Sequence, residues 1–170
     1  LQDYVTGPVK VNYEDISGAK TFELDMVKAT INVPEVGWRK APGVQAIARF
    51  RLTESGSSKT LHNFSFLAEG VEVRGNLKID GTGDLVLADF SSFNLRPNDK
   101  AKMIVRPRSG GGFAIVMDAE RFDGRALFDS FGSNHSQSSA SNHQEPISLS
   151  LSIGRLIGFR GVQAQNVRVD

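Results

Sequence analysis

The sequence lacks cysteine, has only three histidines in 170 residues, and holds no apolar run near the roughly 20 residues of a membrane-spanning helix. The absence of cysteine excludes disulfides, zinc–thiolate sites and thiol catalysis. Because 20 Lys and Arg nearly balance 19 Asp and Glu, no strong overall field recruits nucleic acid or an anionic membrane. The sequence begins at Leu1 rather than Met, and we expect it to be a piece of a longer protein. Function is therefore expected to come from a surface.

A two-residue alternation of apolar and polar side chains recurs along nearly the whole chain. It is clearest where Val71, Val73, Gly75, Leu77 and Ile79 alternate with charged and amide side chains. Only a β-strand with one dry face and one wet face requires this period. The pattern predicts an all-β, mainly antiparallel fold, arranged as a twisted, curved meander sheet or an open groove.

Turn signals divide the chain into short strands. Residues 80–83 read Asp-Gly-Thr-Gly, which predicts a hairpin, and the Gly-rich stretch 109–112 predicts another. Residues 34–43 carry two Pro and two Gly and are predicted to be a connection. A switch of apolar parity between Met26 and Val27 predicts a bulge or a bend.

One segment breaks the alternation and is predicted to form a short helix at 123–131. Asp123 is a suitable N-cap residue, and Leu127 and Phe131 are four positions apart on one helical face. Gly132 stands where a left-handed C-terminal residue is common. We expect this helix to cover one end of the sheet or part of its apolar face.

The helix and the segment after it define the predicted organisation of the chain. Residues 133–146 have no apolar side chain larger than Ala, so they are predicted to be a Ser-rich flexible linker. Residues 1–132 then form a β-rich groove unit that ends in the short helix. Residues 147–170 are predicted to be strands that either return to the sheet or start the next repeat.

No constellation of polar residues has the spacing of a metal, nucleophile or phosphate site. His62 is interpreted as a core or rim histidine because no second His or carboxylate stands beside it at ligand spacing. His135 and His143 lie in the Ser-rich segment, which is a poor preorganised site. A small acidic group is interpreted as capping and solvation: Asp118, Glu120 and Asp123. We therefore predict no metal, no cofactor and no enzymatic activity.

Several segments together resemble AsmA-like proteins of the YhdP type, and they cover most of the chain. They are the connection 34–43 with Gly37-Trp38-Arg39-Lys40 at its centre, the strand 71–80 with its central Gly75, the Gly111-Gly112-Phe113 entry to a strand, the element 123–127 and the restart at 147–153. The Ser-rich stretch 133–146 is not part of the family's pattern.

The resemblance implies a large Gram-negative envelope protein, anchored in the inner membrane by an N-terminal helix outside this chain and lying mostly in the periplasm. Such proteins form a long antiparallel β-groove whose apolar concave face carries phospholipid acyl chains and supports outer-membrane lipid homeostasis. The implied partners are phospholipid and the remainder of the membrane-anchored chain, without nucleic acid. The family has no catalytic residues, so the transferable feature is the inward apolar parity. It maps onto Val44, Ala46, Ala48, Phe50, Val71, Val73, Leu77, Ile79, Ile115 and Met117.

The alternation by itself leaves two functions open. If the dry face is not sealed by a second layer, it is a greasy channel in which each buried acyl CH₂ gains about 0.8 kcal/mol. A closed barrel or sandwich uses the same alternation to build an ordinary core. The leading hypothesis is therefore passive binding or conduction of acyl chains, and the alternative is a structural or protein-interaction β-domain with a sealed core and no ligand.

Overall fold

The structure is a computed structural model that describes residues 4–33, 37–125 and 147–170. The described residues are nearly all β, with 70% in strands and 3% helical. This confirms the predicted fold class. The Ser-rich segment 133–146 lies outside the described residues, as does most of the predicted helix at 123–131.

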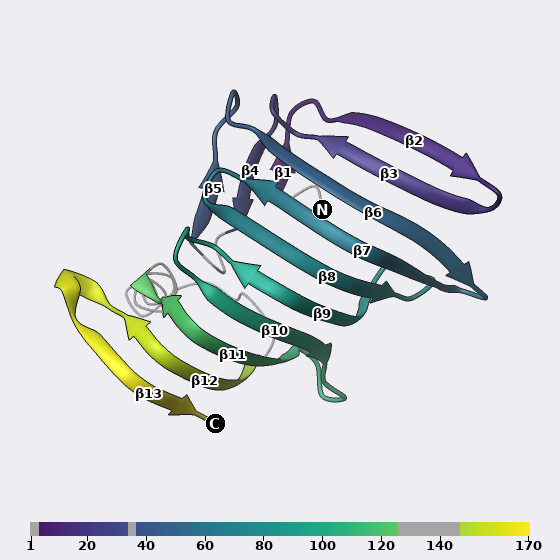
Figure 1. Ribbon diagram of the computed structural model, residues 1–170. Helices are drawn as coiled ribbons and strands as arrows, with labels where there is room; N and C mark the ends of the chain where they lie inside the picture. The colour runs from purple at the N-terminus through teal and green to yellow at the C-terminus, as the bar shows by residue number, and fades with distance from the viewer. Residues whose placement is uncertain (1–3, 34–36, 126–146) are drawn as a thin grey trace, which may run out of the picture.

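Ten strands form one large open and curved sheet, which Figure 1 shows as a twisted ribbon array. Their spatial order is β13-β12-β11-β10-β9-β8-β7-β6-β3-β2. The strands are β2 (Lys10–Ile16), β3 (Ala19–Asp25), β6 (Ala46–Ser55), β7 (Ser58–Ala68), β8 (Val71–Ile79), β9 (Leu85–Asn94), β10 (Lys100–Pro107), β11 (Phe113–Asp123), β12 (Ile147–Ile157) and β13 (Gln163–Val169). The predicted hairpins at 80–83 and 109–112 are confirmed, because they join β8 to β9 and β10 to β11.

Every neighbouring pair in the large sheet is antiparallel except β11 and β12, which run parallel from Phe113↔Ile147 to Asp123↔Ile157. Parallel pairing requires a long crossover connection, and residues 124–146 separate these two strands in the sequence. Strand direction is not encoded in the apolar alternation, so this pairing was not predicted. A 3-10 turn, η2 (Phe159–Gly161), joins β12 to β13.

A smaller sheet of three strands, in the order β1-β4-β5, lies beside one end of the large sheet (Figure 1). Its strands are β1 (Val5–Thr6), β4 (Thr30–Val33) and β5 (Trp38–Lys40). The chain reaches it through a turn at residues 26–29, where the Val27 N–H donates to Asp25 Oδ1 at 2.9 Å. This turn confirms the bend that was predicted near Met26 and Val27.

The prediction that 34–43 is only a connection was wrong, because β5 lies within it and pairs with β4. The reason is packing. The Trp38 ring meets the Phe66 ring edge-on at a centroid distance of 5.5 Å, and burial of an indole against the large sheet outweighs the flanking Pro and Gly signals.

The buried side chain of Lys40 links β5 to the turn at residues 26–29. Its side chain is only 2% exposed, and its Nζ donates to the carbonyl oxygens of Ala29 at 2.7 Å, Ala41 at 3.0 Å and Val27 at 3.4 Å. Burial lowers the pKa of Lys40, and the negative charge of Asp25 opposes this effect. The ammonium group therefore satisfies buried carbonyls at the point where the chain crosses between the two sheets.

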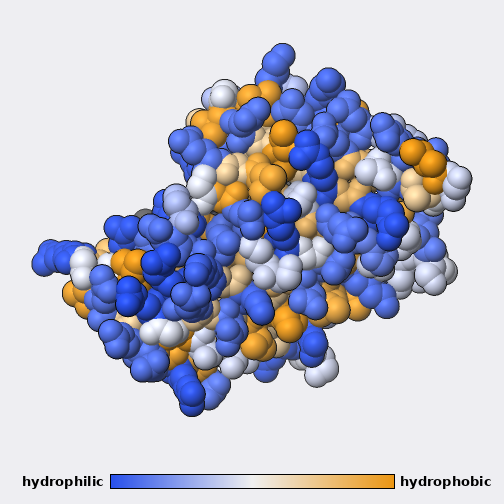
Figure 2. Space-filling model, viewed as in Figure 1, coloured by the Kyte–Doolittle hydropathy of each residue, from blue (hydrophilic) through white to orange (hydrophobic). Residues whose placement is uncertain are grey.

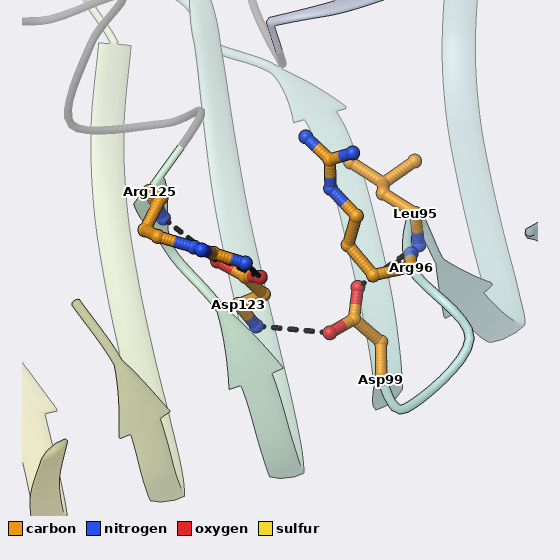
Figure 3. A network of polar contacts seen from close by, with 5 residues as sticks. All are labelled: Leu95, Arg96, Asp99, Asp123 and Arg125. Carbon is orange, nitrogen blue, oxygen red and sulfur yellow. Dashed lines mark hydrogen bonds and ion pairs between the residues drawn. The ribbon is translucent and has the colours of Figure 1, made fainter. Parts of the chain in front are cut away.

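A second buried charge, Asp99, holds the turn between β9 and β10 against the end of β11 (Figure 3). Its Oδ2 accepts the N–H groups of Leu95 at 3.1 Å and Arg96 at 2.9 Å, and its Oδ1 accepts the Asp123 N–H at 2.9 Å. Burial raises the pKa of Asp99, while these three N–H donors act in the opposite direction.

Asp123, the expected N-cap of the helix, is the last residue of β11. It accepts the Arg125 backbone N–H at 3.2 Å and pairs with the Arg125 guanidinium, which lowers the pKa of the Asp123 carboxyl. The remaining predicted helical positions from 126 onward lie outside the described residues.

Candidate functional site

One face of the large sheet is apolar across all ten strands, and the register shows this in two overlapping rows. The first row runs through the paired residues Val11, Leu24, Ala48, Phe66, Val73 and Phe93. The second runs through Phe64, Gly75, Phe90, Met103, Met117, Leu151 and Val169. Because paired residues share a face, the dry sides of all the strands form one surface.

Gly75 lets two aromatic rings meet in the middle of this surface. A Cβ atom at this position would lie 2.1 Å from the Asp89 carbonyl oxygen and 2.7 Å from the Phe90 Cα, both backbone atoms. The bulge in β9 brings its backbone this close to β8. Phe64 and Phe90 flank the glycine from either side with a centroid distance of 6.4 Å. The two rings thus keep the apolar surface continuous at Gly75, which has no side chain of its own.

The apolar face has a covered end. Here the small sheet packs on the first residues of β6 and the last residues of β7, and a core cluster forms between the layers: Met26, Ala29, Ile31, Ala46 and Ala48. A second cluster continues along the same end of the strands from β8 to β12: Val71, Val73, Phe93, Ala101, Met117, Ala119, Phe122 and Ile153. All of these side chains are buried, as in an ordinary protein core.

The other end of the same face is open. Ala88, in register with Leu77 and Val105, is buried at 2% exposure. The larger side chains there are half-buried, and they come from eight strands: Phe22, Phe50, Leu52, Leu61, Leu77, Ile79, Leu85, Val105, Ile115 and Leu149. At the β2 edge the surface ends in a stack of aromatic rings, in which Tyr13 lies 5.0 Å from Phe22 and Phe22 lies 5.1 Å from Phe50. Tyr13 is 50% exposed. An exposed apolar surface of this continuity is typical of a binding surface.

Charged residues enter the open end at one corner. Lys20 lies opposite Asp15 across the β2–β3 pair and forms an ion pair with Glu54 at 3.5 Å. Glu54 in turn lies opposite Lys59. Two lysines and two carboxylates balance at this corner. The register gives no charged residue to this face in β8–β12 within the described segments.

The opposite face of the sheet carries ion pairs, one between β6 and β3 and one within β8. Arg49 Nε lies 2.7 Å from Glu23 Oε2, and Arg74 Nε lies 3.4 Å from Glu72 Oε1. The Arg49 guanidinium lowers the pKa of Glu23. Figure 2 shows one side of the molecule, where hydrophilic side chains predominate with hydrophobic patches between them. The polar face is therefore solvated, and the apolar face is the distinctive surface.

The structure places nine of the ten predicted site residues on the apolar face. Ala46, Ala48, Val71, Val73 and Met117 lie buried at the covered end, whereas Phe50, Leu77, Ile79 and Ile115 lie half-buried at the open end. Val44 lies half-buried in the bend before β6, outside the strand register. The predicted residues thus share one face of the sheet, but five of them belong to the covered core and four to the open end.

Bulges change which side chains lie on the apolar face, and the alternation in the sequence does not reveal them. In β7 the register shifts between Leu61 and Phe64, where Asn63 has a φ of 52°. His62 therefore lies opposite Arg51 on the polar face rather than beside Phe64, and its Nε2 is 2.9 Å from Thr53 Oγ1. Strict alternation assigns His62 to the apolar face, because it assumes an unbroken strand.

The described residues contain no group of three or more His, Asp or Glu side chains arranged to hold a metal ion. In the same segments, no helix is long and apolar enough to cross a membrane. Comparison of the chain with protein-family models, curated proteins and solved structures finds no match. The resemblance to AsmA-like proteins stays a prediction.

Proposed function

We propose that this chain is a segment of a Gram-negative envelope protein that binds phospholipid acyl chains on the open end of its apolar face. In this proposal it lies in the periplasm, as part of a longer membrane-anchored chain, and supports outer-membrane lipid homeostasis without catalysis. The single observation that carries the proposal is the change from a buried core to a half-buried apolar surface along one continuous sheet face.

The dimensions of the open end suit a hydrocarbon ligand. It extends from β3 to β12, which are separated by seven strand spacings. At about 4.8 Å per spacing this is about 34 Å, against about 15 Å for the hydrocarbon of one bilayer leaflet. Each CH₂ group removed from water contributes about 0.8 kcal/mol. The surface therefore has room for an acyl chain in more than one position, as passive sliding requires.

The distribution of charge gives such a lipid an orientation. The strip contributed by β8–β12 has no charged residue on its apolar face among the described residues, so a head group has no partner there. Hairpin loops at 80–84 and 108–112 border this end and are exposed, apart from Asp80 and Gly112. We place the acyl chains across the strands and the head groups in water at this border.

Native mass spectrometry tests the proposal directly. The purified chain is incubated with a phosphatidylethanolamine bearing two 16-carbon chains, and wild type is compared with Leu77→Asp and with Lys78→Asp. These neighbours point to opposite faces of β8, so the second variant is a matched control. We expect bound lipid in wild type and the control and its loss in Leu77→Asp. Equal lipid binding by all three proteins would contradict the proposal.

The second candidate is a structural β-domain that assembles through its edges. It is favoured by β2, in which all seven residues are exposed and one backbone edge is unpaired within the described chain. This function predicts concentration-dependent association without bound lipid. Sedimentation of the lipid-free chain, with Asn12→Pro as an edge-blocking variant, separates it from the first candidate.

A further inference from the structure

Three basic residues stand directly opposite one another on three adjacent strands at the end away from the open apolar surface. Lys100 in β10 pairs in register with Arg121 in β11, which pairs with Arg155 in β12. Like charges placed directly opposite one another are destabilising. We call Lys100, Arg121 and Arg155 the basic row.

Neighbouring acidic residues neutralise only part of this charge. Lys100 forms an exposed ion pair with Glu120 at 3.2 Å, whereas Arg121 Nε donates to the Asn98 carbonyl oxygen at 2.6 Å rather than to a carboxylate. Asp123 is engaged by Arg125, as Figure 3 shows. Counted over residues 95–100, 120–125 and 154–163, six basic and three acidic residues give a net charge of +3, against +1 for the whole chain.

An exposed apolar turn lies at the same end. Phe159 is 45% and Val162 is 66% exposed, and Arg160 stands between them in the sequence. The turn begins four residues after Arg155, or roughly 13 Å along the chain. Figure 2 shows hydrophilic side chains gathered at the left end, where Figure 1 places the ends of β11 and β12.

We propose that this end of the sheet docks on a bilayer surface that contains anionic phospholipid. Phe159 and Val162 enter the interfacial layer, and the basic row faces the phosphate groups. A basic surface with a protruding apolar turn is typical of interfacial membrane binding, whereas a nucleic acid would leave the turn without an apolar partner. At roughly 13 Å from the turn, the basic row lies a little beyond the Debye length of about 10 Å in 0.1 M salt, so salt weakens its attraction to the lipid phosphates only in part.

Vesicle sedimentation of the 170-residue chain tests this surface. The vesicles are pure phosphatidylcholine or a 70:30 mixture with phosphatidylglycerol, in 0.1 M salt. We expect binding to the anionic vesicles only, about 30-fold weaker binding for the double variant Arg121→Gln, Arg155→Gln, and release of wild type in 0.5 M salt. The double variant Arg49→Gln, Arg74→Gln removes the same charge elsewhere on the polar face and should bind as wild type does.

Equal weakening by both double variants, or equal binding to neutral and anionic vesicles, would overturn the proposal. Tighter binding of a single-stranded DNA oligonucleotide than of anionic vesicles at the same salt would also overturn it, in favour of nucleic acid. The double variant Arg121→Gln, Arg155→Gln is compared only if it keeps the β-sheet circular dichroism spectrum of wild type. If it does not, release of wild type from anionic vesicles in 0.5 M salt supports the proposal, and retention overturns it. The inference stands apart from the acyl-chain proposal, since Leu77→Asp should leave vesicle docking unchanged.

Discussion

Two substitutions on one strand, Val73→Asp and Leu77→Asp, should have very different effects on stability. Both side chains point to the apolar face of β8, four residues apart. Val73 is 8% exposed and pairs with Phe66 and Phe93 in the covered core, whereas Leu77 is half-buried at the open end. The pair therefore compares a sealed and an open part of the same surface.

The magnitudes follow from the two environments. Val73→Asp loses about 2 kcal/mol of apolar burial and adds several kcal/mol for an unpaired buried carboxylate. The total, about 5 kcal/mol, matches the whole stability of many domains. Leu77→Asp loses about 1 kcal/mol, half of a full Leu burial, because the carboxylate reaches water on the open side. We expect Val73→Asp to be largely unfolded and Leu77→Asp to fold.

Urea denaturation followed by circular dichroism and by tryptophan fluorescence measures the difference. Trp38 is the sole tryptophan and packs edge-on against Phe66, so its emission reports the contact between the two sheets. If Leu77→Asp lowered the free energy of unfolding as much as Val73→Asp, the face would be sealed at both positions. That result would refute the distinction between a covered and an open end.

The other predictions concern three residues that hold local structure: Gly75, Lys40 and Asp80. Gly75→Ala places a Cβ 2.1 Å from the Asp89 carbonyl oxygen, so it should destabilise the chain by about 2–3 kcal/mol, and an unchanged urea midpoint would show that the β8–β9 contact is loose. Lys40→Met removes donors from buried carbonyls and should cost about 2 kcal/mol. Because burial lowers the pKa of Lys40, wild-type stability should rise with pH from that lowered pKa to its ordinary value of 10.5, a slope that Lys40→Met abolishes. Hydrogen bonds, first that of the Thr82 hydroxyl, lower the pKa of Asp80. The contribution of Asp80 to the free energy of unfolding should therefore be fully present above pH 3.8 and disappear as the pH falls through the lowered pKa. Asp80→Asn should remove this acid sensitivity in urea titrations at several pH values, and an unchanged pH profile would count against it.

Alternation along the sequence predicted the sheet because a strand with one dry face leaves a two-residue period. It predicted Ala46, Ala48, Val73 and Leu77 on one face, and the register places them there. The same alternation carries no information about how much of that face a second layer covers. The covered end depends on β5, which was not predicted because it is short and lies between Pro and Gly residues that are typical of a connection.

Bulges limited the prediction of the candidate site more than strand identity did. Phe90 and Phe93 both lie on the apolar face although three positions separate them, since β9 contains a register shift. Their rings lie 5.9 Å apart. The basic row was also hidden, because Lys100, Arg121 and Arg155 are far apart in the sequence and meet only through strand pairing.

The central claim is that hydrocarbon lies on the open end of the apolar face, and site-specific photocrosslinking tests it most directly. A benzophenone amino acid replaces Leu77 or, in the control, Lys78, which points to the polar face. After irradiation with phospholipid, mass spectrometry of the protein should show a lipid adduct at position 77 and none at 78. Equal adducts at both positions, or none at 77 in a folded protein, would contradict the claim.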